Sequence, residues 1–282
     1  MQLEALDVSK TFRSRRTAAP VHAVRNATLT ARPGQFVAIV GESGSGKSTL
    51  ARLLLDLLEP TEGSVRLDGR EVGSMDRAGK RAYRRSVQAV LQDPAGSLNP
   101  RKRVSRAIGE VIRLQGMART PAETRRRVSE VLELVGMAPA GDYLDRFPHE
   151  LSGGQRQRAH IAMVLAQDTD YVLLDEPLNN LDLRHATSIM RLLRRTAAER
   201  GKTVVLVIHD INIAAAYSDR IIAMKDGSIV ADGTPAQIMR TDVLRLVYDM
   251  EMQVAEVAGR YVALYFDGED EPEGIGAVLS TA

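Results

Sequence analysis

The sequence predicts an α/β fold built on a parallel, doubly wound sheet with a helical segment inserted into it. Short apolar runs that are typical of buried strands alternate with stretches that have the leucine spacing of helices. This alternation is typical of parallel sheets with helices on both faces. Residues 93–150 lack strand-like runs and have helical patterns instead. We therefore expect an α/β core with a helical subdomain between two parts of it.

The first core strand is expected at residues 35–40, a β-branched and aromatic run between Pro33-Gly34 and Gly41. A glycine-rich turn follows, and the leucine spacing predicts a helix over residues 48–58. A second helix is expected over residues 183–200. Asp226-Gly227 between two short apolar runs indicates an antiparallel ribbon near residues 221–232. The remaining core strands are expected at residues 171–174, 203–208 and 221–224.

The helical segment contains a start signal, Thr120-Pro121-Ala122-Glu123, which is a capping box with proline at the first helical position. The helix that it opens is expected to end near Gly136. We divide the chain at the changes of pattern: residues 1–92 and 151–240 form the α/β core, 93–150 the helical subdomain and 241–282 a C-terminal appendage with an acidic tail.

Composition excludes several classes of protein. The 282 residues contain no cysteine, which excludes disulfides, thiolate metal sites and thiol catalysis. The longest apolar runs are far below the roughly 18 residues that a membrane span needs. The first ten residues, MQLEALDVSK, lack the apolar core of a signal peptide. We expect a cytosolic protein, unless something else holds it at a membrane.

The net charge of +2 does not argue for nucleic acid, but it hides an asymmetry. Residues 1–150 carry 25 basic and 17 acidic side chains, whereas residues 151–282 carry 13 and 19. These charges are interpreted as solvated faces, or as a docking surface for lipid headgroups or a partner protein. The basic clusters lie at residues 77–85, 101–106 and 125–127, and five acids lie within 267–273.

The turn after the first core strand fits the P-loop pattern. Its glycines let backbone N–H groups turn inward around phosphates at the positive end of a helix. Lys47 would reach the β- and γ-phosphates, and the Ser48 hydroxyl would bind Mg²⁺. A flexible glycine turn is the alternative, which the strand before and the helix after disfavour. The loop runs through Gly41, Glu42, Ser43, Gly44, Ser45, Gly46, Lys47, Ser48 and Thr49.

A second apolar strand, Tyr171-Val172-Leu173-Leu174, ends in two acids, Asp175 and Glu176. Asp175 would hold the Mg²⁺ shell, and Glu176 would polarise the attacking water as a general base. An acid pair that closes a strand is more often a solvated strand end. Together with a P-loop, it indicates nucleotide hydrolysis.

Leu151-Ser152-Gly153-Gly154-Gln155 has the pattern of another helix start, with Ser152 as N-cap and Gln155 at the third position. Its free N–H groups and positive dipole could hold a phosphate. Two phosphate-binding helix ends on one chain suggest two nucleotides shared between two copies. With the P-loop and the acid pair, the chain resembles the nucleotide-binding subunit of ABC transporters over roughly residues 3–240. The resemblance implies a RecA-like P-loop NTPase core with an antiparallel β subdomain.

The resemblance assigns further residues. Phe12 matches the aromatic position that stacks on adenine, with a core phenylalanine as the alternative. Gln92 matches the Q-loop glutamine, which senses Mg²⁺ and the attacking water. His209 matches the switch histidine that contacts the γ-phosphate. Asp182 closes the D-loop, where Asn179-Asn180 stands in place of the Ser-Ala of many relatives. We interpret His22, His149, His160 and His185 as structural.

The family mechanism implies two ATP-binding subunits facing head to tail, as a homodimer or heterodimer. Each ATP, with Mg²⁺, would lie between the P-loop of one copy and Ser152 to Gln155 of the other. The helical subdomain would contact integral membrane permease subunits, which place the chain at the cytoplasmic face of the membrane, with a solute-binding protein as an indirect partner. No nucleic acid is expected. A soluble ABC ATPase acting on nucleic acid is a remote alternative, because tandem cassettes and a long coiled-coil insertion are lacking.

Two importer types compete for the substrate. Residues 1–158 resemble ATPases of oligopeptide, dipeptide and nickel importers, for example in Gln92-Asp93-Pro94-Ala95-Gly96-Ser97-Leu98-Asn99-Pro100-Arg101. Residues 159–266 resemble ATPases of ferric-siderophore importers, for example in His209-Asp210-Ile211-Asn212. A natural or constructed mosaic is one hypothesis. We favour the peptide or nickel type, because the helical subdomain should choose the permease, with the ferric-siderophore type as the alternative.

Overall fold

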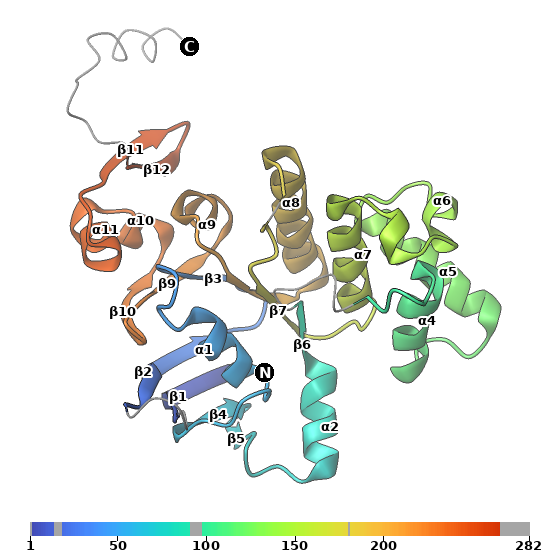
Figure 1. The fold of residues 1–282 in the computed structure, drawn as a ribbon, viewed down its shortest axis with the longest axis horizontal. Coiled ribbons are helices and arrows are strands. Elements are labelled where there is room, and N and C mark those ends of the chain that lie inside the picture. The colour runs from blue at the N-terminus through green and yellow to red at the C-terminus, as the bar shows by residue number, and fades with distance from the viewer. Residues whose placement is uncertain (1, 14–18, 91–97, 180, 266–282) are drawn as a thin grey trace, which may run out of the picture.

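The computed structural model describes residues 2–13, 19–90, 98–179 and 181–265 (Figure 1). Within them, the chain forms a six-stranded sheet, a four-stranded antiparallel sheet and a two-stranded C-terminal hairpin, with helices around them. Figure 1 shows the helices of the inserted segment at one end of the molecule and the C-terminal hairpin at the other. The predicted α/β class with an inserted helical segment is confirmed.

The six-stranded sheet carries the functional loops, and its strand order is β10-β9-β3-β8-β7-β6. Neighbouring strands are parallel, except that β10 is antiparallel to β9. Every residue of β3, β7 and β8 is buried, which explains their continuous apolar runs. The four predicted strands each match within one residue at either end. The strands are β3 (Phe36–Val40), β6 (Val87–Val90), β7 (Tyr171–Asp175), β8 (Thr203–Val207), β9 (Arg220–Lys225) and β10 (Ser228–Gly233).

The four-stranded antiparallel sheet has the order β2-β1-β4-β5, and the sequence pattern did not locate it. The pairing of β1 with β2 shifts register at three points, so the alternation of buried and exposed residues is interrupted. The edge strand β6 of the other sheet was missed as well, because it is only four residues long. The antiparallel strands are β1 (Leu3–Phe12), β2 (Val21–Ala31), β4 (Glu62–Leu67) and β5 (Arg70–Glu71).

Two predicted helices of the core are present, and one is shorter than expected. Helix α8 (Leu183–Arg200) has the predicted bounds. Helix α1 (Lys47–Leu54) ends before residue 58, because Asp56 takes a left-handed backbone conformation with φ 56°. Helix α2 (Arg77–Ser86) was not predicted as a helix, since half of its residues are basic and one side chain, Tyr83, is buried.

The inserted segment is helical in its described part, residues 98–150. The helix predicted from Thr120 is α5, and Thr120 Oγ1 accepts from Glu123 N at 3.1 Å. The predicted capping box also requires the Glu123 side chain to accept from the backbone N–H of Thr120. This part of the prediction is wrong, because Glu123 Oε2 accepts from the backbone N–H of Arg119 instead. Helix α7 (Gly153–Leu165) follows and packs on α4 and α5. The elements of the segment are α4 (Val104–Leu114), α5 (Pro121–Leu134), α6 (Gly141–Leu144) and the 3₁₀ turn η1 (Pro148–Glu150).

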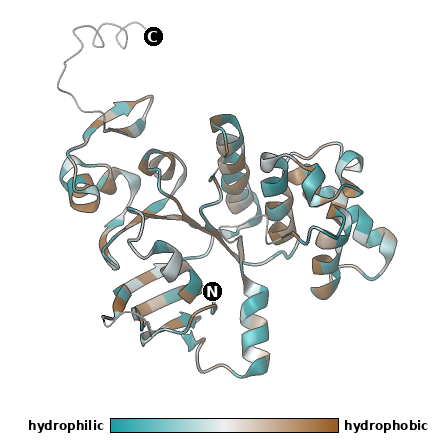
Figure 2. Ribbon diagram, in the orientation of Figure 1, coloured by the Kyte–Doolittle hydropathy of each residue, from teal (hydrophilic) through white to brown (hydrophobic). Residues whose placement is uncertain are grey.

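The core lies on both faces of the central sheet. Along β3, Ala38 belongs to the hydrophobic cluster shared with α7, α8 and the inserted helices, whereas Val37 and Ile39 belong to the cluster shared with α1 and the antiparallel sheet. Figure 2 shows these central strands in brown, the colour of apolar residues. Among the helices that the structure describes, none is long and apolar enough to cross a bilayer.

The C-terminal part of the chain packs against the β9–β10 side of the core. Helix α11 contacts both of these strands, and the hairpin contacts helix α9. Figure 1 shows these elements in orange. They are α9 (Ile211–Tyr217), α10 (Pro235–Ile238), α11 (Thr241–Tyr248), β11 (Gln253–Val257) and β12 (Arg260–Leu264).

Candidate active site

The P-loop joins β3 to α1 and packs tightly against neighbouring backbone. Gly46 is the N-cap of α1, and its φ of 98° is a conformation that favours glycine. A Cβ on Gly46 would lie 2.2 Å from the carbonyl oxygen of Ala23, and one on Gly41 would lie 2.1 Å from that of Met224. Side chains are therefore excluded at both positions, and the loop keeps the tight turn that phosphate binding requires.

Lys47 lies inside this loop. Its side chain is buried, and Nζ donates to the carbonyl oxygens of Gly41 at 2.8 Å and of Glu42 at 2.5 Å. Burial lowers the pKa of Lys47, and the carboxylates of Glu176, Asp175 and Glu42 oppose that shift. The ammonium group is thus held at the centre of the loop by oxygens, where a phosphate could replace them as its partner.

Ser48 and Asp175 form an oxygen-rich pair beside Lys47. Ser48 Oγ donates to Asp175 Oδ1 at 2.9 Å, and Asp175 is the last residue of β7. Asp175 is 2% exposed, and its Oδ2 atom is buried without a hydrogen-bond partner. Burial raises the pKa of Asp175, against the hydrogen bond from Ser48. A buried carboxylate oxygen without a partner, next to a hydroxyl, fits Mg²⁺, a hard cation that binds oxygen ligands.

Glu176 is held from two sides. His209 Nε2 lies 2.5 Å from its Oε1, and Asn179 Nδ2 donates to its Oε2 at 2.5 Å. Its backbone is left-handed, with φ 52°, and its N–H donates to the carbonyl oxygen of Val207 at 3.0 Å. A strained backbone that neighbouring bonds stabilise is common at functional sites. Sequence reasoning had marked Asn179 only as a departure from the family pattern, so its contact with Glu176 was missed.

The sheet brings these residues together. Strands β3, β8 and β7 are adjacent and parallel, and Asp175 is in register with Val207. Their carboxyl ends therefore open at one edge, where the P-loop, the acid pair and His209 follow β3, β7 and β8. Ligands of open α/β sheets bind at this edge.

Phe12 is the last residue of β1, and 41% of it is exposed. Lys10 Nζ lies 5.5 Å from the centre of its ring. The interpretation of Phe12 as a core phenylalanine is therefore wrong, because the ring belongs to neither hydrophobic cluster. An exposed aromatic ring is available for stacking on a planar ligand.

The Ser152–Gln155 segment begins α7 as the sequence predicts. Ser152 Oγ accepts from Gln155 N at 3.2 Å, and Gln155 Oε1 accepts from Ser152 N at 3.0 Å. Figure 1 shows α7 and α1 well apart, so the second helix end does not meet the P-loop of the same chain. This placement suits a ligand shared with another molecule.

Asp182 connects α8 with that segment through His185. Asp182 caps α8, and its carboxylate lies 2.8 Å from the backbone N and 2.7 Å from Nδ1 of His185. These hydrogen bonds hold the pKa of Asp182 below its usual range. A Cβ on Gly154 would lie 2.8 Å from the His185 ring, so this histidine packs directly against the start of α7.

Replacing Ser152 with alanine should destabilise α7. The substitution removes the oxygen that caps Gln155 N, so the free energy of unfolding should fall by about 1 kcal/mol. Urea unfolding followed by circular dichroism measures this change. Ser152→Thr keeps a hydroxyl and should recover most of the loss, and equal stability of wild type and Ser152→Ala would contradict the capping role.

Several expected residues remain to be placed. Gln92 and Asn180 lie outside the described residues. Among the described residues, no group of three or more histidine, aspartate or glutamate side chains is arranged to hold a metal ion. Of the histidines interpreted as structural, two have local partners: His22 Nδ1 lies 3.0 Å from Thr11 Oγ1, and the His149 ring stacks on Phe147. His160 is buried.

Comparison with known proteins adds to this geometry. The family model described as "ABC transporter" matches residues 24–179. A petrobactin import ATP-binding protein of Bacillus subtilis is 37% identical over 239 residues, which cover 85% of this chain and 92% of the relative. A dipeptide transport ATP-binding protein of Lactococcus lactis is 38% identical over 218 residues, which cover 77% and 69%.

A solved structure is similar as well. It is a dimeric post-hydrolysis state of an ATP-binding cassette bound to ADP and Pi, with a TM-score of 0.75 and 33% identity. The match covers 83% of this chain and 98% of that one. Family, relatives and structure therefore agree on an ATP-binding cassette.

Proposed function

Because the chain belongs to the ABC transporter family and is an importer-type ATPase in it, we propose that it drives uptake of a peptide- or nickel-type solute. The observation that carries the hydrolytic part is the cluster at the edge of the central sheet. There, Lys47 lies inside the P-loop, Asp175 has a buried oxygen without a partner, and Glu176 contacts His209.

Each residue of the cluster has a proposed task. Lys47 and the N–H groups of the P-loop bind the β- and γ-phosphates. Ser48 and Asp175 would hold Mg²⁺, with Gln92 as a further ligand, and this ion would neutralise charge on the phosphates. Glu176 accepts the proton of the attacking water as general base, and His209 orients Glu176 and the γ-phosphate. The exposed ring of Phe12 stacks on adenine.

The working unit is proposed to be a dimer of ATP-binding subunits. The separation of α1 from α7 supports it, because one chain cannot close both helix ends on one nucleotide (Figure 1). ATP would bind between the P-loop of one copy and Ser152–Gln155 of the other. Asp182, through His185, would transmit closure between α8 and that segment.

A basic groove supports the proposal that this chain contacts the cytoplasmic side of a membrane permease. The groove, of about 400 Å³, lies between α2 and the end of α4, so it spans the core and the helical subdomain. Asp56 pairs with Lys80 and lies 3.6 Å from Arg84, and Leu114 beside the groove is 80% exposed. Figure 2 shows α2 mostly in the hydrophilic colour. The groove is lined by Arg77, Lys80, Arg81, Arg84, Arg85, Gln88, Leu114 and Gln115.

This composition suits a partner segment that is acidic and partly apolar. Five cations against one neighbouring carboxylate attract acidic groups, and exposed Leu114 offers apolar area. The groove also includes Gln88 of β6, a strand that ends two residues before Gln92 in the sequence. An occupant could therefore link the permease to the nucleotide site, which is the task that an importer ATPase requires.

Reversing two charges of the groove should separate binding to the permease from hydrolysis. Arg81→Glu with Arg85→Glu should leave basal ATPase activity unchanged and lower permease-stimulated activity by at least about tenfold, because like charges then face the acidic segment. ATPase assays of the reconstituted complex measure this effect. Arg191→Glu on the exposed face of α8 is the matched control. Full stimulation of the double variant would contradict docking in this groove.

The substrate class follows from the permease. The helical subdomain, residues 93–150, belongs to the part of the chain that resembles peptide and nickel importers, and this supports the peptide or nickel type. A ferric-siderophore importer is the second candidate. The match to this chain covers 92% of the petrobactin import relative, whereas it covers 69% of the dipeptide transport relative.

Co-expression decides between these candidates. The tagged chain is expressed with a peptide- or nickel-type permease pair, or with a ferric-siderophore-type permease, and co-purification and ATPase stimulation are compared. Assembly with the first pair supports the proposal. Assembly with the second would show that contacts after residue 158 choose the partner. Binding to neither, with ATPase intact, would contradict both substrate classes.

A further inference from the structure

The side chain of Asn212 joins the start of helix α9 to the C-terminal hairpin by two hydrogen bonds. Asn212 Nδ2 donates to the carbonyl oxygen of Ala263 at 3.1 Å, and Ala263 N donates to Asn212 Oδ1 at 2.7 Å. The amide of Asn212 thus pairs with β12 as the backbone of a neighbouring strand would. Ala263 is buried, so water competes little for these two bonds.

Asn212 lies beside the histidine of the candidate active site. It is the second residue of α9, and the N-cap of α9 is Asp210, which directly follows His209. Asp210 Oδ1 accepts from the backbone N–H of Asn212 at 2.8 Å. Asn212 is therefore tied to Asp210 by its backbone and to the hairpin by its side chain. β8 ends at Val207, so the short link through His209 is held at its far end by the start of α9.

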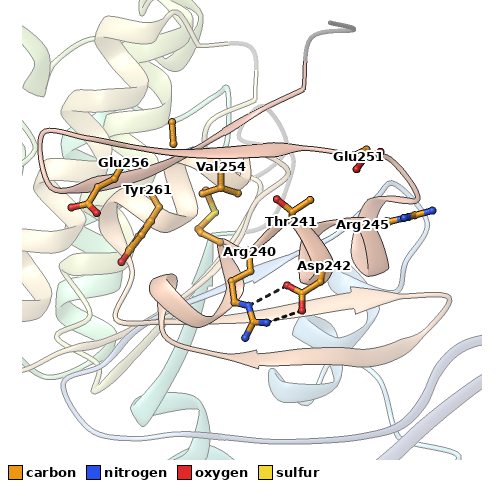
Figure 3. A pocket seen from close by; sticks show the side chains of 10 residues that line it. Arg240, Thr241, Asp242, Arg245, Glu251, Val254, Glu256 and Tyr261 are labelled. Atoms are coloured by element: carbon orange, nitrogen blue, oxygen red, sulfur yellow. Dashed lines mark hydrogen bonds and ion pairs between the residues drawn. The ribbon is translucent and has the colours of Figure 1, made fainter. Parts of the chain in front are cut away.

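A cleft opens on the other side of the hairpin. It has a volume of about 780 Å³ and lies between the hairpin and residues 239–245, around the start of α11 (Figure 3). Val254, Glu256 and Tyr261 line the cleft from the hairpin side, opposite the Arg240–Asp242 ion pair. Val254 and Tyr261 also pack against the main hydrophobic cluster, and the bonds to α9 add a directional anchor to this packing.

The rest of the appendage approaches the same edge of the sheet. Lys225 of β9 donates to the carbonyl oxygen of Leu246 at 3.0 Å and lies 2.5 Å from Asp249. Tyr248, the last residue of α11, has a buried hydroxyl without a hydrogen-bond partner. Burial raises the pKa of Tyr248, and the charges of Asp210 and of Glu42 in the P-loop add to the shift. The end of α11 is thus fixed to the last residue of β9.

We propose that Asn212 is a positioning residue for hydrolysis, which fixes the start of α9 to β12 and so holds His209 against Glu176. The hairpin then sets turnover without touching the nucleotide. This inference rests on the proposed role of His209. It predicts a larger effect on the catalytic step than on ATP binding, since Lys47 and the P-loop lie on another strand.

Steady-state ATPase kinetics of Asn212→Ala in the full-length chain test the inference. Both hydrogen bonds between Asn212 and Ala263 are lost, so kcat should fall about tenfold while KM for ATP stays within about twofold. Arg260→Ala is the matched control. It removes the bond from the hairpin to the carbonyl oxygen of Ala216, 3.3 Å away at the far end of α9, and should leave kcat within about twofold. Equal losses in the two variants would overturn the inference.

A double-mutant cycle separates positioning from general stability. If Asn212 acts through His209, then Asn212→Ala should cost nothing further in a His209→Ala background. Losses that multiply would overturn the inference, even if each variant melts at the wild-type temperature. Hydrolysis at the wild-type rate by the single variant His209→Ala would overturn the proposed role of His209 itself. The single variant therefore distinguishes this outcome from a failure of the inference about Asn212.

Discussion

Glu176→Gln should lower kcat for ATP hydrolysis by about 10³-fold while ATP binding is kept. Glutamine has the shape of glutamate, but it cannot accept a proton from the attacking water, and removal of a general base typically costs 10²–10⁴-fold. Of the two contacts to Glu176, from His209 and Asn179, the single oxygen of the glutamine amide can keep one. The site should therefore stay assembled and lose the chemical step.

Two measurements check this expectation. Phosphate release gives kcat, and size-exclusion chromatography with ATP gives the oligomeric state. Glu176→Gln should accumulate as a dimer with ATP, because hydrolysis no longer reopens it. Glu62→Gln, an exposed carboxylate in β4, is the matched control and should behave as wild type. Hydrolysis at the wild-type rate by Glu176→Gln would refute its assignment as general base.

Lys47→Ala should fail earlier, at nucleotide binding. The ammonium group lies inside the P-loop, and its loss leaves the phosphates without their buried counter-charge. Hydrogen bonds that involve charged groups contribute about 1.5–3 kcal/mol each, so Kd for ATP should rise about 100-fold if two phosphate contacts are lost. The fold should survive, because removing a buried ammonium also removes the cost of its desolvation.

Isothermal titration with ATP measures this loss, and thermal melting without nucleotide checks the fold. The melting temperature of Lys47→Ala should equal or exceed that of the wild type. Lys80→Ala removes a lysine from the basic groove and should bind ATP as the wild type does. A wild-type Kd in Lys47→Ala would exclude Lys47 from phosphate binding. Glu176→Gln should thus lose hydrolysis and keep ATP binding, whereas Lys47→Ala should lose ATP binding. The two variants together separate the chemical step from nucleotide binding.

The inner strands of the central sheet were predictable, because both of their faces are covered. Burial on both faces requires continuous apolar runs such as 203–207, and such runs are visible without a partner strand. The antiparallel sheet was not located, since β1 and β2 are partly exposed and change register. Helix α2 was missed for a related reason: Tyr83 is its one buried residue, and half of its residues are basic, so it shows no apolar face.

The sequence by itself determined the chemistry that the site can perform. Gly41 and Gly46 take positive φ angles that favour glycine, and Lys47, Asp175 and Glu176 stand at fixed sequence distances from strand ends, so their types and order in the chain suffice to predict phosphate binding. The helix start at Ser152 is equally local, since its cap spans only three residues.

Only the tertiary structure decided how these groups are held. Three features of the site depend on contacts between separate elements. Glu176 lies between Asn179 and His209, and one oxygen of Asp175 lacks a partner. Asn212 pairs with Ala263. Asn212 and Ala263 are 51 residues apart, and His209 and Glu176 are 33 apart. Local patterns carry no information on such distances, because they depend on how strands and helices pack. The arrangement of the site is therefore a property of the fold, whereas its residue types are a property of the motifs.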